Sequence, residues 1–429
     1  GLSRLFPLLR KDYSPSERRE ASRLLLEHGA RGPGVDQALI DAVEDVSSGR
    51  DGALITDLVR KGADVNYQIG RVLSLAATQV DMSLLRLLCN ARPKPSSTSA
   101  ALPLAFDSQG GRHSKTFEII DLLLGYGVEE DSAGKALEIA INGGSDNCDI
   151  IQRLLTACPR LLSTAFKHTT TLSDPQKKAP ILDALLKLGV SQESLDQALA
   201  DETRHAVSTN DTTSTKLLLR RGASVSHNDG EALSIAVASG NSSLTAMLLS
   251  GKHQASRSSL TRAFRTLFTD ETLGVNENKE NVHDLAQELL ARGVEQLAID
   301  AALRVVLSHE HDVNDTEKLV DLLLRFNADV NTVDGACFVF AAQKHSHTIF
   351  KRLMLHNPKF SIVVPALLRS KLQEEVVVAA IQSCFDHGCT SDQFGIGSTK
   401  TPLLITAMTV YPRNIDLIKL LLDNGLDPD

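Results

Sequence analysis

Two short stretches of this chain combine residue types that could bind a phosphate or a metal. Residues 395–401 (GIGSTKT) place glycines beside a lysine, as phosphate-binding loops do. However, the spacing Gly-x4-Gly-Lys-Ser/Thr is absent and no strand is expected before them. Residues 309–312 (HEHD) offer imidazole and carboxylate ligands suited to a first-row metal. They alternate within a polar stretch typical of a solvated loop, so neither stretch predicts a cofactor or a metal site.

The histidines and cysteines also fall short of a catalytic pattern. His345 and His347 lie in an expected turn between two helices, where we expect a hydrogen bond that stabilises the turn. Cys384 and Cys389 are five residues apart and have no accompanying His-Asp pattern to activate a nucleophile. We find no serine elbow, paired-carboxylate cleft or glycine-rich dinucleotide turn. The sequence therefore predicts a protein that is not an enzyme and binds no cofactor.

A repeated phrase determines which elements must position any functional residue. Two or three leucines, two variable residues and a glycine occur first at Leu24–Gly29. The clear later copies end in the glycines Gly62, Gly127, Gly189, Gly222, Gly293 and Gly425. Weaker copies end in Ala91, Cys158, Lys252, Asn327, Asn357 and Gly388. The intervals cluster near 33 residues over about thirteen copies, which is typical of a repeat solenoid.

Each copy predicts a pair of helices. Leucines at helical spacing bury one face, and the glycine after them is expected in the left-handed conformation that ends a helix. An alanine-rich phrase precedes most copies, and Leu233 to Leu248 leaves room for one short helix, a turn and the start of a second. Because one pair cannot bury both its faces, neighbouring pairs must stack. We therefore expect an all-α helix-turn-helix repeat solenoid that forms a single body over residues 1–429.

These phrases resemble the ankyrin repeat. Gly62-Ala63-Asp64-Val65-Asn66 matches the family's closing phrase in full, residues 328–331 nearly so, and residues 222–226 in part. Thr401-Pro402-Leu403-Leu404 is the one good copy of its opening phrase. The resemblance covers residues 15–429, mostly through degenerate copies, and it implies an ankyrin-like superhelix. HEAT and armadillo units are longer, and tetratricopeptide units carry aromatics at set places, which is unlike a chain with 4% aromatics and no tryptophan.

Some copies depart from the ankyrin pattern. Residues 36–39 and 196–199 read Asp-Gln-Ala-Leu where the opening phrase belongs, so we expect a finger that is shortened or absorbed into a longer first helix. In the family, residues that flank the finger and end the first helix make variable contacts. The resemblance therefore implies a set of partner-binding residues here: Tyr67, Gln68, Arg71, Thr78, Gln79, Asn228, Asp229, Ser239, Thr332, Val333, Gln343 and Lys344.

The regular pattern is interrupted by polar stretches. We expect flexible insertions near residues 106–116, 168–180, 269–284 and 308–315, and we expect lysines 167, 177, 178 and 187 to lie on solvated helix surface. Near the N-terminus, Ser14-Pro15-Ser16-Glu17 forms a capping box. In the helix that it starts, we expect Arg18 to face solvent and Leu24 to face inward. Both ends of the sequence interrupt a repeat, so we expect a fragment of a longer chain.

Composition narrows the class of partner. The net charge of −8 argues against nucleic acid, because phosphate binding needs a basic face. No apolar run approaches the roughly 18 residues of a membrane span, and the six scattered cysteines are expected to be reduced, as in cytoplasm or nucleus. We expect a scaffold that presents a concave ankyrin-like surface to a protein or peptide. The alternative is a regulatory or ligand-sensing arm of a larger protein, with an intramolecular domain as its partner and the catalytic domain outside this sequence.

Overall fold

The computed structural model describes residues 2–12, 14–45, 51–106, 113–269, 279–308, 313–344, 346–394 and 402–426. Parts of three predicted insertions (107–112, 270–278 and 309–312), His345 and the stretch 395–401 lie outside the described residues. Residue contacts divide the chain into an N-terminal body, Gly1–Ala198, and a C-terminal body, Leu199–Asp429. The prediction of one body over residues 1–429 stays a prediction.

Every regular element of the described residues is a helix, which confirms the predicted all-α fold class. In the N-terminal body, consecutive helices pack in pairs, here called repeats, each made of a first and a second helix. These repeats are α1 (Phe6–Asp12) with α2 (Pro15–Glu27), α3 (Pro33–Glu44) with α4 (Gly52–Arg60), α5 (Tyr67–Thr78) with α6 (Met82–Cys89), α7 (Pro95–Ala101) with α8 (His113–Gly125), α9 (Glu130–Gly143) with α10 (Cys148–Ala157), and α11 (Leu162–Thr170) with α12 (Pro175–Lys187).

The C-terminal body is built in the same way. It begins within α13 (Gln192–Thr209), which has residues in both bodies, and continues with α14 (Thr213–Arg220). Its further repeats are α15 (Glu231–Ala238) with α16 (Ser242–Leu249), α17 (Arg257–Leu267) with α19 (Lys279–Arg292), α20 (Gln296–Ser308) with α21 (Val313–Arg325), α22 (Thr332–Gln343) with α23 (His347–Met354), α24 (Phe360–Arg369) with α25 (Glu374–Asp386), and α26 (Leu403–Val410) with α27 (Ile415–Asp423). At 18 residues, α13 is the longer first helix expected at the Asp-Gln-Ala-Leu of 196–199, whereas α3, which carries the copy at 36–39, has 12.

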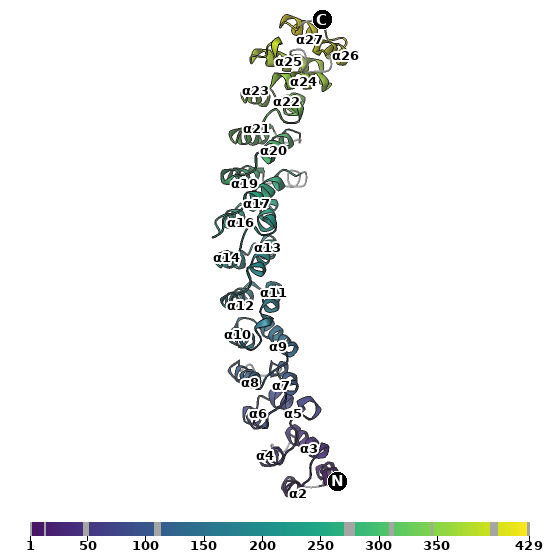
Figure 1. Cartoon of the computed structure of the whole chain (residues 1–429), viewed down its shortest axis with the longest axis vertical. Helices are drawn as coiled ribbons and strands as arrows, with labels where there is room; N and C mark the ends of the chain where they lie inside the picture. The colour runs from purple at the N-terminus through teal and green to yellow at the C-terminus, as the bar shows by residue number, and fades with distance from the viewer. Residues whose placement is uncertain are drawn as a thin grey trace. The chain divides into compact units, whose positions relative to one another are not determined.

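The helices of each body form two layers. In the N-terminal body α3, α5, α7, α9 and α11 line one side and α4, α6, α8, α10 and α12 the other (Figure 1). Small residues such as Ala76 and Ala136 are fully buried in first helices, and leucines such as Leu85 and Leu88 are fully buried in second helices. Small side chains thus let first helices approach one another, and leucine fills the space between layers. Among the described residues, no helix is both long and apolar enough to cross a membrane.

The helix ends follow the sequence closely. The glycines that end the clear leucine phrases all have positive φ, from 83° at Gly425 to 102° at Gly293, as predicted. Several second helices begin at a polar side chain that accepts a hydrogen bond from the amide three residues later, as Asp81 does from Leu84 and Asn241 from Leu244. The helix pair over Leu233–Leu248 is therefore the predicted one, with its turn between α15 and α16.

The predicted cap of α2 is confirmed, but the predicted orientations of two residues in this helix are wrong. Ser14 and Glu17 form the predicted capping box at the start of α2. Leu24, however, is 48% exposed rather than turned inward. Arg18 is half-buried, and its side-chain exposure of 27% contradicts the predicted solvent-facing position. The buried stripe of this helix is shifted by about one residue from the predicted one, because Ser22 and Leu26 are its buried residues.

Residues 168–180, predicted as an insertion, contain the end of α11 and the start of α12. Lys178, expected on solvated surface, is only 2% exposed. Its Nζ donates to the carbonyl oxygen of Thr170 at 3.0 Å. Since Thr170 is the last residue of α11, the lysine satisfies one of the carbonyl groups that a helix end leaves without a partner.

Successive repeats are joined by hydrogen bonds from a backbone amide of one repeat to a side chain of the repeat before it. In the N-terminal body the bonds run from Asp64 N to Asp36 Oδ1 (2.7 Å), from Lys94 N to Asn66 Oδ1 (2.6 Å) and from Glu129 N to Ser99 Oγ (2.7 Å). In the C-terminal body they run from Ser256 N to Ser226, Glu295 N to Thr261, Asp329 N to Asp300 and Lys359 N to Asn331. In all of them the acceptor side chain belongs to the earlier repeat.

Candidate functional site

Three repeats enter their first helix through a turn of left-handed backbone, here called a finger. The fingers comprise residues 68–70 (Gln-Ile-Gly), 228–230 (Asn-Asp-Gly) and 333–335 (Val-Asp-Gly). Every residue in them has φ between 49° and 79°. Asparagine, aspartate and glycine tolerate this conformation, whereas a β-branched residue in it is a genuine outlier. Ile69 and Val333 are therefore strained, at φ values of 57° and 51°.

The last residue of each finger touches the next first helix. A Cβ on Gly70 would lie 2.5 Å from the Cβ of Ser97 in α7, and a Cβ on Gly230 would lie 2.5 Å from the Cβ of Ser259 in α17. Real Cβ atoms do not approach so closely, so only glycine fits there. The finger thus brings the backbone of one repeat against the first helix of the next, and this contact holds the strained residues in place.

The strained side chains point away from the fold. Ile69 is 67% exposed and Val333 is 59% exposed. Ile69 was missed from the sequence, because neither its residue type nor its spacing signals an exposed left-handed position. Val333 was predicted as a contact residue, and that role stays a prediction.

The predicted contact residues at the start of first helices lie on or beside the fingers. Gln68, Asn228 and Asp229 are exposed in fingers, while Tyr67 and Thr332 are half-buried just before them. Three of the exposed groups already have partners. The Gln68 Nε2 donates to Gln37 Oε1 at 3.1 Å. Arg71 pairs with Glu44 at 2.7 Å, and the Asn228 Nδ2 donates to Glu231 at 2.8 Å. In each body, these predicted residues therefore lie at the start of first helices, and they are here called the finger row.

The predicted contact residues at the end of first helices form a separate row. Thr78, Ser239 and Gln343 are exposed, and Gln79 and Lys344 are half-buried C-cap residues. Residues 71–78 span about 12 Å at 1.5 Å per residue, so the two rows lie at opposite ends of the first helices. Thr78 and Ser239 also donate to backbone carbonyls of their own helix. The structure does not bring the two groups of predicted residues together in one site.

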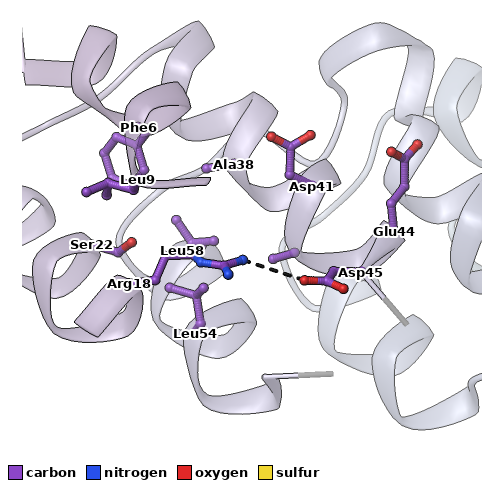
Figure 2. Close-up of a pocket in the computed structure, with 11 residues that line it drawn as sticks. Phe6, Leu9, Arg18, Ser22, Ala38, Asp41, Glu44, Asp45, Leu54 and Leu58 are labelled. Atoms are coloured by element: carbon purple, nitrogen blue, oxygen red, sulfur yellow. Dashed lines mark ion pairs between the residues drawn. The ribbon is translucent and has the colours of Figure 1, made fainter. Parts of the chain in front are cut away.

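A pocket that sequence analysis missed lies in the N-terminal body among α1, α2, α3 and α4, and has a volume of about 610 Å³ (Figure 2). Phe6 and Leu9 of α1 and Leu54 and Leu58 of α4 contribute an apolar wall, and each is less than 10% exposed. The carboxylates of α3 and its C-cap, Asp41, Glu44 and Asp45, line the opposite side. Their spacing of three and four residues along one helix was the signal available in the sequence.

The Arg18 side chain reaches across the pocket. Its Nη1 lies 3.5 Å from Asp45 Oδ2, and its Nε is buried without a hydrogen-bond acceptor among the described residues (Figure 2). Glu44 accepts two hydrogen bonds from Arg71, and Asp41 accepts one from Gln37 at 3.0 Å. Among the described residues that line it, the pocket thus has three carboxylates and the guanidinium group of Arg18.

Smaller hollows lie elsewhere. One of about 480 Å³ lies beside α1 and α2 and is lined mainly by leucines. Another, of about 390 Å³, lies between α9 and α11, with Glu130, Glu138 and His168 in its wall. A third, of about 280 Å³ in the C-terminal body, is lined by alanines of α22 and α25 together with polar and apolar residues that include His347 and Phe350. None of the residues that line these hollows has a side-chain polar atom that is buried without a partner.

The histidines and the two polar stretches that were first considered for chemistry show no catalytic arrangement in the part of the chain that the structure describes. In the turn before α23, Ser346 Oγ accepts from the amide of Ile349. His345 lies outside the described residues, so the turn-stabilising hydrogen bond expected of His345 and His347 stays a prediction. Residues 309–312 and 395–401 lie outside the described residues. In the part of the chain that is described, no group of three or more His, Cys, Asp or Glu side chains is placed to hold a metal ion.

Burial makes most of the cysteines poor nucleophiles. It raises the pKa of the Cys89 and Cys337 thiols to about 11 and that of Cys389 to about 12, and it raises the pKa of Cys384 strongly. The half-buried Cys148 and Cys158 also have raised pKa values, chiefly through burial. Because the thiolate is the reactive form, these thiols lack the lowered pKa of a catalytic cysteine.

We expect iodoacetamide at pH 7.5 to alkylate Cys148 and Cys158 first, because they are more accessible than the four buried cysteines. Cys89, Cys337, Cys384 and Cys389 should react only when urea unfolds the protein. Peptide mass spectrometry after timed labelling measures each site. Labelling of Cys384 in the native protein as fast as that of Cys148 would contradict this burial pattern.

No protein-family model and no curated protein matches this sequence. Among solved structures, the chain is similar to a "Circular tandem repeat protein with novel repeat topology and enhanced subunit contact surfaces". The identity is 14% and the TM-score 0.16, and the match covers 96% of this chain and 85% of that one. At that TM-score no property of the similar protein is transferred to this chain. The helix pairs, their layers and the bonds between successive repeats make the chain a helical repeat protein.

Proposed function

We propose that this chain is a protein-binding repeat scaffold of the ankyrin type, with the fingers and the exposed face of the first helices in contact with a protein or peptide. One observation carries the proposal. Two aliphatic residues, Ile69 and Val333, are held in left-handed backbone and exposed to solvent. Each such residue costs about 1–3 kcal/mol, and strain of this kind concentrates where a protein makes functional contacts.

Nothing within the fold accounts for the choice of these two side chains. Glycine or asparagine would adopt the same backbone at lower cost, and the equivalent finger positions 228 and 229 carry Asn and Asp. Exposed aliphatic groups gain free energy only when another surface covers them. Ile69 and Val333 therefore suit contact with an apolar part of a partner.

The hydrogen bonds made by the closing phrase support the ankyrin assignment. Asp64 Oδ1 accepts from both the amide and the side chain of Asn66, and Asp329 does the same for Asn331. Each asparagine then accepts from the amide of the next repeat, at Lys94 or Lys359. The phrase therefore stabilises the turn before the finger and joins two repeats, which gives a physical reason for its resemblance to the family pattern.

The finger residues give a test with two readouts of opposite sign. We expect Ile69→Asn and Val333→Asn each to raise the free energy of unfolding by about 1 kcal/mol, because asparagine tolerates positive φ. Urea unfolding followed by circular dichroism measures this change. Ile405→Asn is the matched control, because Ile405 is 51% exposed in a right-handed helix and gains no relief of strain.

For binding, peptides selected by display against the unaltered protein should lose at least tenfold in affinity for Ile69→Asn or Val333→Asn and keep their affinity for Ile405→Asn. Isothermal titration calorimetry with each selected peptide measures the dissociation constants. If the selected peptides bind all three variants equally well, the fingers are not the contact surface. If the finger variants are less stable than the unaltered protein, the argument from strain is wrong.

A further inference from the structure

We propose that the first helices of the C-terminal body bind an acidic segment of a partner protein. The contact follows Arg265 of α17, Arg304 of α20 and Arg369 of α24, here called the arginine row. The inference rests on the proposed protein-binding function. It adds to that function the charge of the partner and the spacing of its acidic residues.

The three arginines hold the same position in their helices. Each directly follows two buried residues, and each is exposed. In α22, which packs between α20 and α24, the residue at this position is the half-buried Val339. Because these first helices follow one another along one side of the body (Figure 1), the position reads Arg, Arg, Val and Arg from α17 to α24. The buried pairs are Ala263–Phe264, Ala302–Leu303, Cys337–Phe338 and Leu367–Leu368.

The charge on these helices is mainly positive. α17 contains three arginines and α24 contains one, and neither contains an aspartate or a glutamate. α20 and α22 contain one aspartate each. Asp300 is buried and accepts from the amide of Asp329, whereas Asp334 lies in a finger. In a chain with a net charge of −8, this local positive surface attracts carboxylates.

The N-terminal body has no such run of cations. Asp41 of α3 follows the buried pair Leu39–Ile40, and Glu138 of α9 follows the buried pair Ala136–Leu137. Lys167 of α11 has the same position in the next repeat after Glu138. Carboxylates at this position repel an acidic segment, so the charge selects the C-terminal body.

The arginines of the row are available to a partner. Arg304 and Arg369 have no hydrogen-bond or ion-pair partner among the described residues. Arg265 lies 3.9 Å from Glu295, and its side chain is 62% exposed. An exposed pair at this distance contributes little to stability, so a carboxylate of the partner can take the place of Glu295.

The distance between repeats sets the spacing of the partner's residues. Packed helices lie about 8–10 Å apart, and an extended chain advances about 3.3 Å per residue. About three residues of the partner therefore pass each first helix. Acidic residues three positions apart would face Arg265 and Arg304, an apolar residue would face Val339, and a further acidic residue would face Arg369. Each guanidinium can hold a carboxylate through two parallel hydrogen bonds.

The apolar position favours a protein over a nucleic acid. Val339 interrupts the row, and the half-buried Phe340 lies next to it in α22. A peptide can place an apolar side chain there, whereas a nucleic acid carries a phosphate on every nucleotide. The exposed Asp334 of the same repeat would also repel phosphate.

Fluorescence anisotropy with labelled peptides at low salt tests the proposal. The peptide EGSEGSLGSE has glutamates and a leucine in the expected order, and ESGLSGESGE has that order in the other chain direction. The better of the two should bind about tenfold more tightly than its glutamine counterpart and than EEEGSGSGSL, which has the same composition. Equal binding of the glutamine peptide would overturn the acidic partner, and equal binding of EEEGSGSGSL would overturn the arginine row. A short oligothymidylate that binds as tightly as the better peptide would overturn the choice of a protein.

Variants locate the site. Arg304→Gln combined with Arg369→Gln should weaken binding of the better peptide about tenfold. Arg220→Gln combined with Arg325→Gln removes the same charge from exposed positions at the ends of the second helices α14 and α21, and should leave binding unchanged. Equal losses in the two double variants would show a general charge effect and overturn the arginine row.

The two proposals fail in different ways. If the glutamate peptides do not bind while display-selected peptides still depend on Val333, the scaffold function stands and the acidic partner is wrong. If the glutamate peptides bind through Arg304 and Arg369 while display-selected peptides are indifferent to the finger variants, the arginine row stands and the fingers are not the contact surface.

Discussion

Gly230→Ala is expected to lower the free energy of unfolding by about 3 kcal/mol. Part of the loss, about 1 kcal/mol, comes from placing a Cβ on a residue with φ of 79°. The rest comes from overpacking, because the new Cβ would lie 2.5 Å from the Cβ and 3.0 Å from the Cα of Ser259, which is fully buried in α17. Urea unfolding followed by circular dichroism measures the loss.

Gly388→Ala is the matched control within the same body. Gly388 has φ of 92°, and a Cβ built on it meets no atom within 4 Å, so only the conformational cost of about 1 kcal/mol applies. Adding Ser259→Gly to Gly230→Ala should recover part of the steric loss. Equal losses for the two alanine variants would mean that α17 moves aside easily and that the finger contact does not hold neighbouring repeats together.

Lys178→Met is expected to cost about 2 kcal/mol or more. Methionine keeps the length of the side chain but removes the donor that reaches the carbonyl of Thr170, and a buried group deprived of a charged partner loses about that much. The lysine makes further interactions, which methionine also removes. The transition of the N-terminal body in thermal unfolding should move to lower temperature.

Lys177→Met provides the control for the lost charge. Lys177 is exposed in the same helix, so its replacement should change the free energy of unfolding by about 0.5 kcal/mol or less. If Lys178→Met proves as stable as Lys177→Met, the Lys178 ammonium does not stabilise the end of α11. If Lys178→Met is more stable than the unaltered protein, burial of the lysine charge costs more free energy than its hydrogen bonds contribute.

The parts of the fold that could be predicted are those set by local chemistry. A glycine after a leucine run ends a helix for reasons internal to a few residues, and Gly29 or Gly222 therefore behaves as expected. The capping box at Ser14 is likewise local. Helix pairing followed from the period of these signals, since a helix with one apolar face must find a neighbour.

The parts that could not be predicted are imposed by neighbouring repeats. Ile69 adopts left-handed backbone because Gly70 packs on Ser97, a contact between residues 27 positions apart that no property of isoleucine indicates. Lys178 is adjacent to an exposed lysine and is buried only because the end of α11 lies against it. Arg18 enters the pocket because the buried stripe of α2 is shifted toward Ser22. Of the candidate site, the sequence thus indicated Val333 and its row, and it missed Ile69 and the whole pocket.

The direction of the bonds between repeats matters for how the chain is made. Each amide of Asp64, Lys94, Asp329 and Lys359 is accepted by a side chain that the ribosome has already released. A repeat emerging during translation therefore finds the acceptors of these amides on a preceding repeat that has already been synthesised. Such a chain is suited to folding from the N-terminus onward during synthesis, with each new helix pair docking on a finished edge. The same polarity means that a stalled or shortened product keeps these bonds in every repeat that it has completed.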